Sequence, residues 1–284
     1  MLIALEDRSL HYDLMGPPDG PVVCLAHALS ADTGIWAEQV PVLLANGWRV
    51  LRIDMRGHGG SMAGKATLPG GGYTMEELAG DVVRVLDILG TDRVHFVGLS
   101  IGGMIGQILG LDHADRLASL MLCDTSPQNI PGGKQVWDQR FADIAAAGSL
   151  EPLADATMDR WLTDRFHGAN PRRWTEIRAT VANTSPDGYV GGGLAILHFD
   201  VRDRLPRIAV PTMVVWGDED TGTPPEGNQL IADLVPGARS HVFTGARHVP
   251  MVEYPQAFAQ VMLQWLDLNN QAGLHSPAGI AGPG

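Results

Sequence analysis

One serine stands between two glycines in Gly98-Leu99-Ser100-Ile101-Gly102, and this pattern constrains the fold more than any other stretch of the chain. The residues before it, 93–97, are rich in β-formers, and residues 104–109 carry apolar side chains at helical spacing. Because glycine has no Cβ, glycines at these positions let a strand and a helix approach closely around a tight, strained turn. The pattern therefore predicts a strand–turn–helix unit, the nucleophile elbow, with Ser100 at its apex.

A glycine-flanked serine can also be an ordinary turn, so the prediction depends on partners elsewhere in the chain. A neutral serine is a poor nucleophile and needs a base, and a histidine base needs a carboxylate to fix its tautomer. Asp220 and His248 each lie in a loop that follows a predicted strand, after Ser100 in the sequence. We therefore predict the triad Ser100, Asp220 and His248, with Asp218 as the alternative acid.

A reaction at Ser100 also needs hydrogen-bond donors for the negative oxygen that forms in the transition state. The helix after the elbow directs its first free amide, that of Ile101, at this point. The apolar run 21–26 ends in His27-Ala28-Leu29-Ser30, and we predict that the Leu29 amide is the second donor. Alternatively, this segment is an ordinary loop between a strand and a helix. We interpret His27 as a residue that supports the loop without contacting the substrate.

Strands and helices alternate along most of the chain, but residues 128–205 show only helical periodicity. Four helices are predicted there, at about 136–147, 150–166, 172–183 and 187–199. We expect an α/β core over 1–127 and 206–270, an inserted helical cap over 128–205, and a flexible tail over 271–284.

The predicted cap carries aromatic side chains that would line or cover a substrate pocket. They are Trp137, Trp161, Trp174 and Tyr189. Simple packing between helices is the alternative interpretation of these positions.

Composition excludes several classes of function. A net charge of -12 argues against binding to nucleic acid or to anionic membranes. The two cysteines, Cys24 and Cys123, lie in apolar runs and are expected to be core residues. The ten histidines show no metal-ligand spacing, and residues 1–8 do not resemble a secretory signal. We therefore expect no cofactor or metal, and a cytoplasmic location.

The chain resembles the α/β-hydrolase superfamily over almost its whole length, and most of all the 3-oxoadipate enol-lactonase and carboxylesterase group. The stretches that carry the resemblance are Gly98–Met104, Asp54–Ser61, Thr184–Tyr189, Pro211–Gly217 and Asp220–Pro225. The resemblance implies a mostly parallel eight-stranded sheet with helices on both faces, an inserted helical cap, and hydrolysis of a carboxylated enol-lactone without a metal or organic cofactor. The chain departs from the lactonase pattern at His27–Ser30, where that group usually has Asn-Ser-Leu-Gly.

These features predict a serine hydrolase that opens a carboxylic ester or lactone through an acyl-enzyme. A carboxylated substrate would need a cation, for which the cap offers Arg140, Arg160, Arg172 and Arg173. Substrate contacts are expected from Trp137, Arg140, Trp161 and Tyr189. The expected partner is a small ester or lactone, and the chain could form a homo-oligomer. The alternatives are a broad-range carboxylesterase, a C–C bond hydrolase, a cofactor-free perhydrolase, and a ligand receptor with weak turnover.

Overall fold

The computed structural model describes residues 1–67, 70–129 and 133–274, with side chains up to residue 270. Its centre is an eight-stranded sheet in the order β1-β2-β4-β3-β5-β6-β7-β8. β1 pairs antiparallel with β2, and β2 pairs antiparallel with β4, whereas every other pair is parallel. The strands are β1 (Leu2–Ala4), β2 (Ser9–Met15), β3 (Val22–Ala26), β4 (Arg49–Ile53), β5 (Val94–Leu99), β6 (Leu117–Cys123), β7 (Thr212–Gly217) and β8 (Arg239–Phe243). The predicted mostly parallel eight-stranded sheet is confirmed.

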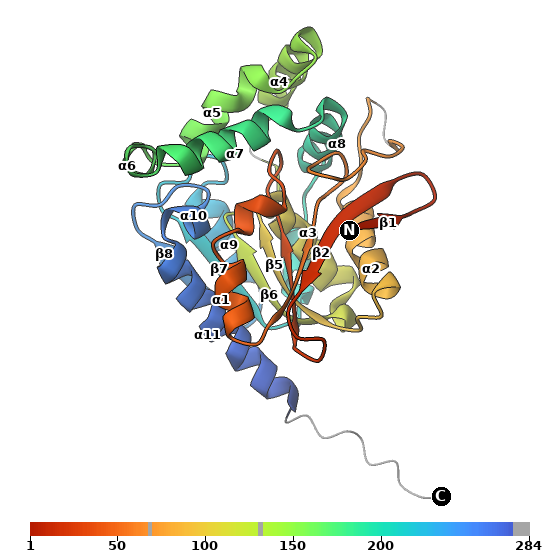
Figure 1. The fold of residues 1–284 in the computed structure, drawn as a ribbon, viewed down its shortest axis with the longest axis vertical. Helices are drawn as coiled ribbons and strands as arrows, with labels where there is room; N and C mark the ends of the chain where they lie inside the picture. Colours follow the sequence, from red (N-terminus) through yellow and green to blue (C-terminus); the bar gives the residue numbers. More distant parts are fainter. Residues whose placement is uncertain (68–69, 130–132, 275–284) are drawn as a thin grey trace, which may run out of the picture.

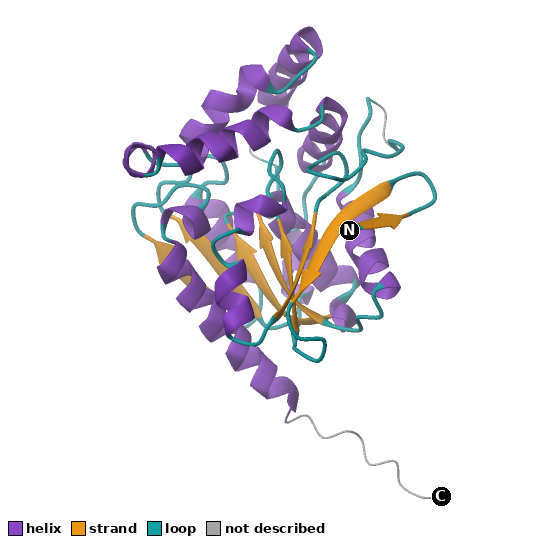
Figure 2. Ribbon diagram, viewed as in Figure 1, coloured by secondary structure: helices purple, strands orange, loops and turns teal. Residues whose placement is uncertain are grey.

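Helices cover both faces of this sheet, so its central strands are buried on both sides (Figure 2). One apolar cluster joins the sheet to α2 (Met75–Ile88), α3 (Ile101–Asp112) and α9 (Pro225–Leu234). A second cluster joins the opposite face to α1 (Val40–Ala45) and α11 (Pro255–Leu274). Cys24 and Cys123 are buried free thiols within these clusters.

The segment between β6 and β7 forms a layer of helices beyond the carboxyl ends of the parallel strands (Figure 1). It contains α4 (Gly133–Ala147), α5 (Glu151–Trp161), α6 (Asp164–Ala169), α7 (Pro171–Asn183) and α8 (Pro186–Leu197). The predicted single helix over 150–166 was wrong, because the chain is extended at Leu162 and Thr163 caps α6 by accepting from the Phe166 amide. The Thr163 amide and hydroxyl both donate to Glu253, which holds the break in place.

Several short elements complete the chain. They are the 3₁₀ turns η1 (Thr33–Trp36), η2 (Ala114–Arg116) and η3 (Arg202–Arg207), and the single-turn helix α10 (Pro250–Glu253). α11 continues to Leu274, so the first four residues of the expected tail are helical, and residues 275–284 lie outside the described residues. Within the part of the chain that the structure describes, no helix is both long and apolar enough to span a membrane.

The glycines around Ser100 are required by close approach of backbones. A Cβ on Gly98 would lie 2.2 Å from the carbonyl oxygen of Gly102, and a Cβ on Gly102 would lie 2.7 Å from that of Ala26. Strands β3 and β5 and helix α3 can therefore meet at the turn only when these positions carry no side chain.

We expect Gly98→Ala to destabilise the fold by about 2 kcal/mol or more, because the methyl group would displace backbone that cannot rotate away. Gly80→Ala in α2 is the matched control: nothing lies within 4 Å of its Cβ position, so alanine should be neutral or stabilise by up to about 1 kcal/mol. Urea unfolding curves of the two variants test this difference, and equal midpoints would contradict it.

Candidate active site

Ser100 occupies the turn between β5 and α3 in a left-handed backbone conformation, with φ 58° and ψ −117°. Its amide donates to the Cys123 carbonyl at 2.9 Å, and its carbonyl accepts from the Thr125 hydroxyl at 2.7 Å. These bonds hold a conformation that a non-glycine residue rarely adopts. The Ser100 side chain faces a cavity of about 330 Å³, and the residue is only 9% exposed.

His248, in the loop after β8, lines the same cavity, and Asp220 contacts it from the loop after β7. The His248 Nδ1 atom lies 2.7 Å from Asp220 Oδ2. The Asp220 carboxylate also accepts from the amides of Gly222 and Thr223 and from the Thr223 hydroxyl. Because a carboxylate only accepts, His248 carries its proton on Nδ1, and its Nε2 atom is free to accept a proton from another group.

The structure places Asp220, and not Asp218, beside His248. Asp218 is exposed and accepts a hydrogen bond from the Gly245 amide at 2.7 Å. Ser100 and His248 line one cavity, although the hydrogen bonds found among the described residues do not include one between their side chains. Such contacts are often long before a substrate binds.

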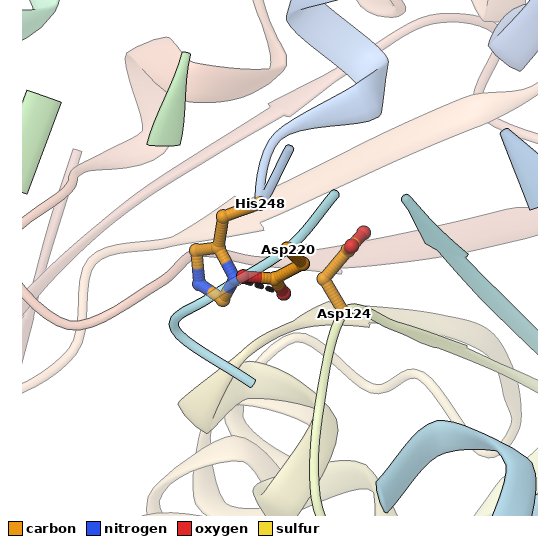
Figure 3. A group of neighbouring side chains, drawn as sticks. All are labelled: Asp124, Asp220 and His248. Carbon is orange, nitrogen blue, oxygen red and sulfur yellow. Dashed lines mark hydrogen bonds and ion pairs between the residues drawn. The ribbon is translucent and has the colours of Figure 1, made fainter. Parts of the chain in front are cut away.

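Asp124 is a second buried acid at this site that the sequence analysis missed. It follows β6 with φ 42°, and its Oδ1 atom accepts from the Gly217 amide at 2.9 Å. Its Oδ2 atom is buried without a hydrogen-bond partner among the described residues. Figure 3 shows the Asp220 carboxylate meeting the His248 ring, while the Asp124 carboxyl group points away from the pair. Its place at the end of an apolar strand was the one sequence signal available.

Burial raises the pKa of Asp124 well above its usual range, and the nearby charge of Asp220 raises it further. Burial therefore favours the neutral form of Asp124. The surroundings of the two carboxyl groups differ, because Asp220 accepts from two backbone amides and from His248, whereas Asp124 accepts only from the Gly217 amide among the described residues.

The backbone amides of Leu29 and Ile101 are both without an acceptor among the described residues. Ile101 is the first residue of α3, so its amide has no partner within the helix. The two side chains lie under α8, because a Cβ on Gly192 would be 2.7 Å from Leu29 Cδ1 and 3.5 Å from Ile101 Cδ1. The structure thus brings both predicted donors to the region of Ser100.

The cap supplies the opposite wall of the cavity. All four side chains expected to contact substrate line it, namely Trp137, Arg140, Trp161 and Tyr189. The Trp161 ring lies 5.9 Å from the His248 ring. Trp174 is not part of this wall and instead stacks on His167 at 4.1 Å. Gln128 and Asn129 also line the cavity, and no sequence pattern had indicated them.

Two of the four candidate arginines face the cavity and two do not. Arg140 and Arg160 line it, and no carboxylate of the described residues forms an ion pair with either. Arg160 donates to the Thr157 hydroxyl at 2.9 Å, and Arg140 lies over the Trp137 ring. Burial and the neighbouring Arg140 charge both lower the pKa of Arg160.

The other two arginines belong to ion pairs outside the cavity. Arg172, whose side chain is 94% exposed, pairs with Glu176, and Arg173 pairs with Glu38 at 2.7 Å. These contacts remove Arg172 and Arg173 from the four candidate cations and leave Arg140, the arginine expected to contact substrate, together with Arg160.

Asp220→Asn should slow labelling of Ser100 by a fluorophosphonate by about 10³-fold or more, because an amide would favour the wrong histidine tautomer. Asp218→Asn is the matched control and should label at the wild-type rate. Labelling rates followed by mass spectrometry test the assignment, and slow labelling of the Asp218 variant alone would reverse it.

Asp124→Asn should stabilise the protein at pH 8 and not at pH 4. The unfolded Asp124 carboxyl has an ordinary pKa of about 4 and is charged at pH 8, so folding must add a proton to it. Folding of the wild type therefore becomes less favourable as pH rises above about 4, and asparagine removes this cost. Thermal unfolding of both proteins across this pH range measures it, and a pH-independent difference would contradict a neutral Asp124.

Comparisons with known proteins agree with this geometry. A family model described as the alpha/beta hydrolase fold matches residues 21–255. The 3-oxoadipate enol-lactonase 2 of Acinetobacter baylyi is 29% identical, over 90% of this chain and 92% of its own length.

Two solved structures of similar sequence have the same fold. The enol-lactonase of Burkholderia xenovorans superposes with a TM-score of 0.87 at 34% identity, covering 94% of this chain and all of that one. A thermophilic esterase from Thermogutta terrifontis superposes with a TM-score of 0.85 at 27% identity, covering 95% of this chain and 99% of that one. The chain belongs to the α/β-hydrolase fold family, and it is a hydrolase.

Proposed function

We propose that the protein hydrolyses a carboxylic ester or lactone through an acyl-enzyme on Ser100. The observation that carries the proposal is that Ser100, Leu29 and His248 line one cavity, with Asp220 bonded to His248 and the amide of Ile101, next to Ser100, without an acceptor among the described residues. The relatives named as enol-lactonase and esterase support the same reaction class.

Acylation begins when Ser100 Oγ attacks the substrate carbonyl carbon and His248 Nε2 takes the hydroxyl proton. The amides of Leu29 and Ile101 stabilise the tetrahedral oxyanion. His248, now charged beside Asp220, gives its proton to the leaving alkoxide or enolate oxygen as the ester bond breaks. An acyl group then remains on Ser100.

Deacylation uses the same groups with water as the nucleophile. His248 removes a proton from water, the resulting hydroxide attacks the acyl carbon, and the same two amides hold the second oxyanion. The proton returns to Ser100 as the acid departs. A lactone would give one ring-opened hydroxy or keto acid, because its leaving oxygen stays tethered to the acyl group.

The cavity favours a substrate that carries a carboxylate in addition to the scissile ester. Arg140 and Arg160 place two positive charges in a partly buried wall, and the described carboxylates leave both unpaired. Partly buried charges of like sign are costly unless an anion is bound between them. Two similar proteins support a carboxylated substrate. One is named 3-oxoadipate enol-lactonase, and the structure of the similar esterase has malate bound; 3-oxoadipate enol-lactone and malate both carry carboxylates.

Ser100→Ala should reduce turnover of p-nitrophenyl butyrate to the uncatalysed rate while leaving the unfolding curve unchanged. The reason is that the proposed acyl-enzyme forms on the Ser100 hydroxyl, which alanine lacks. Release of p-nitrophenol by the purified variant measures this, and turnover at the wild-type rate would contradict the proposal.

Arg160→Met should raise KM for a carboxylated ester, such as p-nitrophenyl hemiglutarate, by about 10-fold or more, because a charged hydrogen bond contributes about 1.5–3 kcal/mol. KM for neutral p-nitrophenyl butyrate should change little. Arg172→Met is the matched control, since its guanidinium lies outside the cavity. Equal effects of Arg160→Met on both esters would contradict carboxylate recognition.

A further inference from the structure

Two buried histidines lie beneath the loop that carries Leu29. His27 is fully buried and His58 is 2% exposed, and their rings are 5.3 Å apart. Neither belongs to the cavity lining or to the triad. The reaction proposed above uses neither of them, so their burial calls for another explanation.

Hydrogen bonds to the backbone fix the tautomer of both rings. The Nε2 atom of His27 faces the Met55 amide at 2.9 Å, and that of His58 faces the Ser30 amide at 3.0 Å. An amide only donates, so each Nε2 atom accepts. The Nδ1 atoms face carbonyl oxygens, of Ala28 at 2.8 Å and Arg56 at 2.9 Å, and therefore carry the protons.

Both rings stay neutral in this arrangement, because a proton on Nε2 would point at the hydrogen of an amide. Burial also lowers the pKa of both histidines, that of His58 to about 3. The charge of His27 would lower the pKa of His58 further, whereas Asp54 acts in the opposite direction on each ring. Each ring is therefore a neutral link between two backbone groups.

These links hold the two peptide groups on either side of Leu29. The Ala28 carbonyl belongs to the same peptide as the Leu29 amide, and it accepts from His27 Nδ1 and from the Ala31 amide at 3.0 Å. In a trans peptide the N–H points opposite to the C=O, so holding that carbonyl also directs the Leu29 amide.

The next peptide is fixed at both of its ends. Its carbonyl, on Leu29, accepts from the Ser30 hydroxyl at 2.6 Å, and its amide, on Ser30, donates to His58. Ser30 has φ 64°, a conformation that a serine rarely adopts without such support.

We infer that His27 and His58 are positioning residues that hold the Leu29 amide in the direction of the oxyanion on Ser100. The inference rests on the proposed function, because it concerns the donor that this reaction needs. His27 acts on the peptide that contains the Leu29 amide, and His58 acts on the peptide that follows.

Replacing His58 by glutamine or by asparagine tests its two hydrogen bonds one at a time. Glutamine places its carbonyl oxygen near the position of Nε2 and can still accept from the Ser30 amide. Asparagine is shorter: its amide can reach the Arg56 carbonyl near the position of Nδ1 and leaves the Ser30 amide without an acceptor. Both variants bury a neutral amide, so the comparison does not depend on polarity alone.

We expect His58→Asn to lower kcat for p-nitrophenyl butyrate about 10- to 100-fold with KM changed less than about twofold, because loss of a whole oxyanion donor costs about 10²–10³-fold. His58→Gln should recover most of the rate. Inhibition by an alkyl trifluoromethyl ketone, whose adduct with Ser100 places an oxyanion on the same amides, should weaken by a similar factor in His58→Asn.

His95→Asn is the matched control for a buried histidine. Its ring bonds to the Ser119 hydroxyl and packs on Trp48, remote from the cavity lining. This variant should keep the wild-type inhibition constant even if it unfolds at a lower temperature. Active-site titration corrects all rates for the folded fraction.

Equal rates and equal inhibition constants for His58→Asn and His58→Gln would overturn the inference, and so would a loss confined to thermal stability. If neither His58 variant folds, His27 gives the second test: His27→Gln removes the donor to the Ala28 carbonyl near the position of Nδ1 and should weaken ketone inhibition, whereas His27→Asn keeps a donor there and should not; equal inhibition constants for the two would overturn the inference. A wild type without Ser100-dependent turnover would instead overturn the proposed function, and this inference with it.

Discussion

The backbone turn at Ser100 is the constraint on which the rest of the site depends. A residue at φ 58° between a buried strand and a buried helix is stable only because its amide and carbonyl are both bonded and its neighbours at 98 and 102 have no side chain. The turn places the Ser100 side chain at the cavity and leaves the first amide of α3 without an acceptor among the described residues. The neighbouring strands β3, β6 and β7 then end beside it because they are parallel to β5 or to one another.

Charge is distributed around this turn by burial and hydrogen bonding. Asp220 accepts hydrogen bonds from the Gly222 and Thr223 amides and from His248, so the proton of His248 lies on Nδ1. Burial raises the pKa of Asp124, which accepts one hydrogen bond, from the Gly217 amide, among the described residues. Across the cavity, Arg140 and Arg160 form no ion pair with a described carboxylate, and the proposed preference for an anionic acyl or alcohol group rests on this positive charge in an otherwise acidic protein.

The sequence predicted the fold well where local patterns and tertiary structure agree. Alternating strands and helices and the serine between glycines are local signals, and the structure contains both. The break at Leu162 was missed because the bond that holds it comes from Glu253, about 90 positions away in the chain. Arg160 was not among the expected substrate contacts, because its place in the cavity depends on which helix face meets the site. His27 was interpreted as a supporting residue, but the contacts of His27, His58 and Asp124 could not be predicted, because they form between separate loops.

Rapid-quench mass spectrometry during turnover of p-nitrophenyl butyrate tests the central claim most directly. The account predicts a burst of p-nitrophenol together with a transient butyryl group on the peptide that contains Ser100. Turnover with no acylated protein at any time, or with the butyryl group on another peptide, would contradict it.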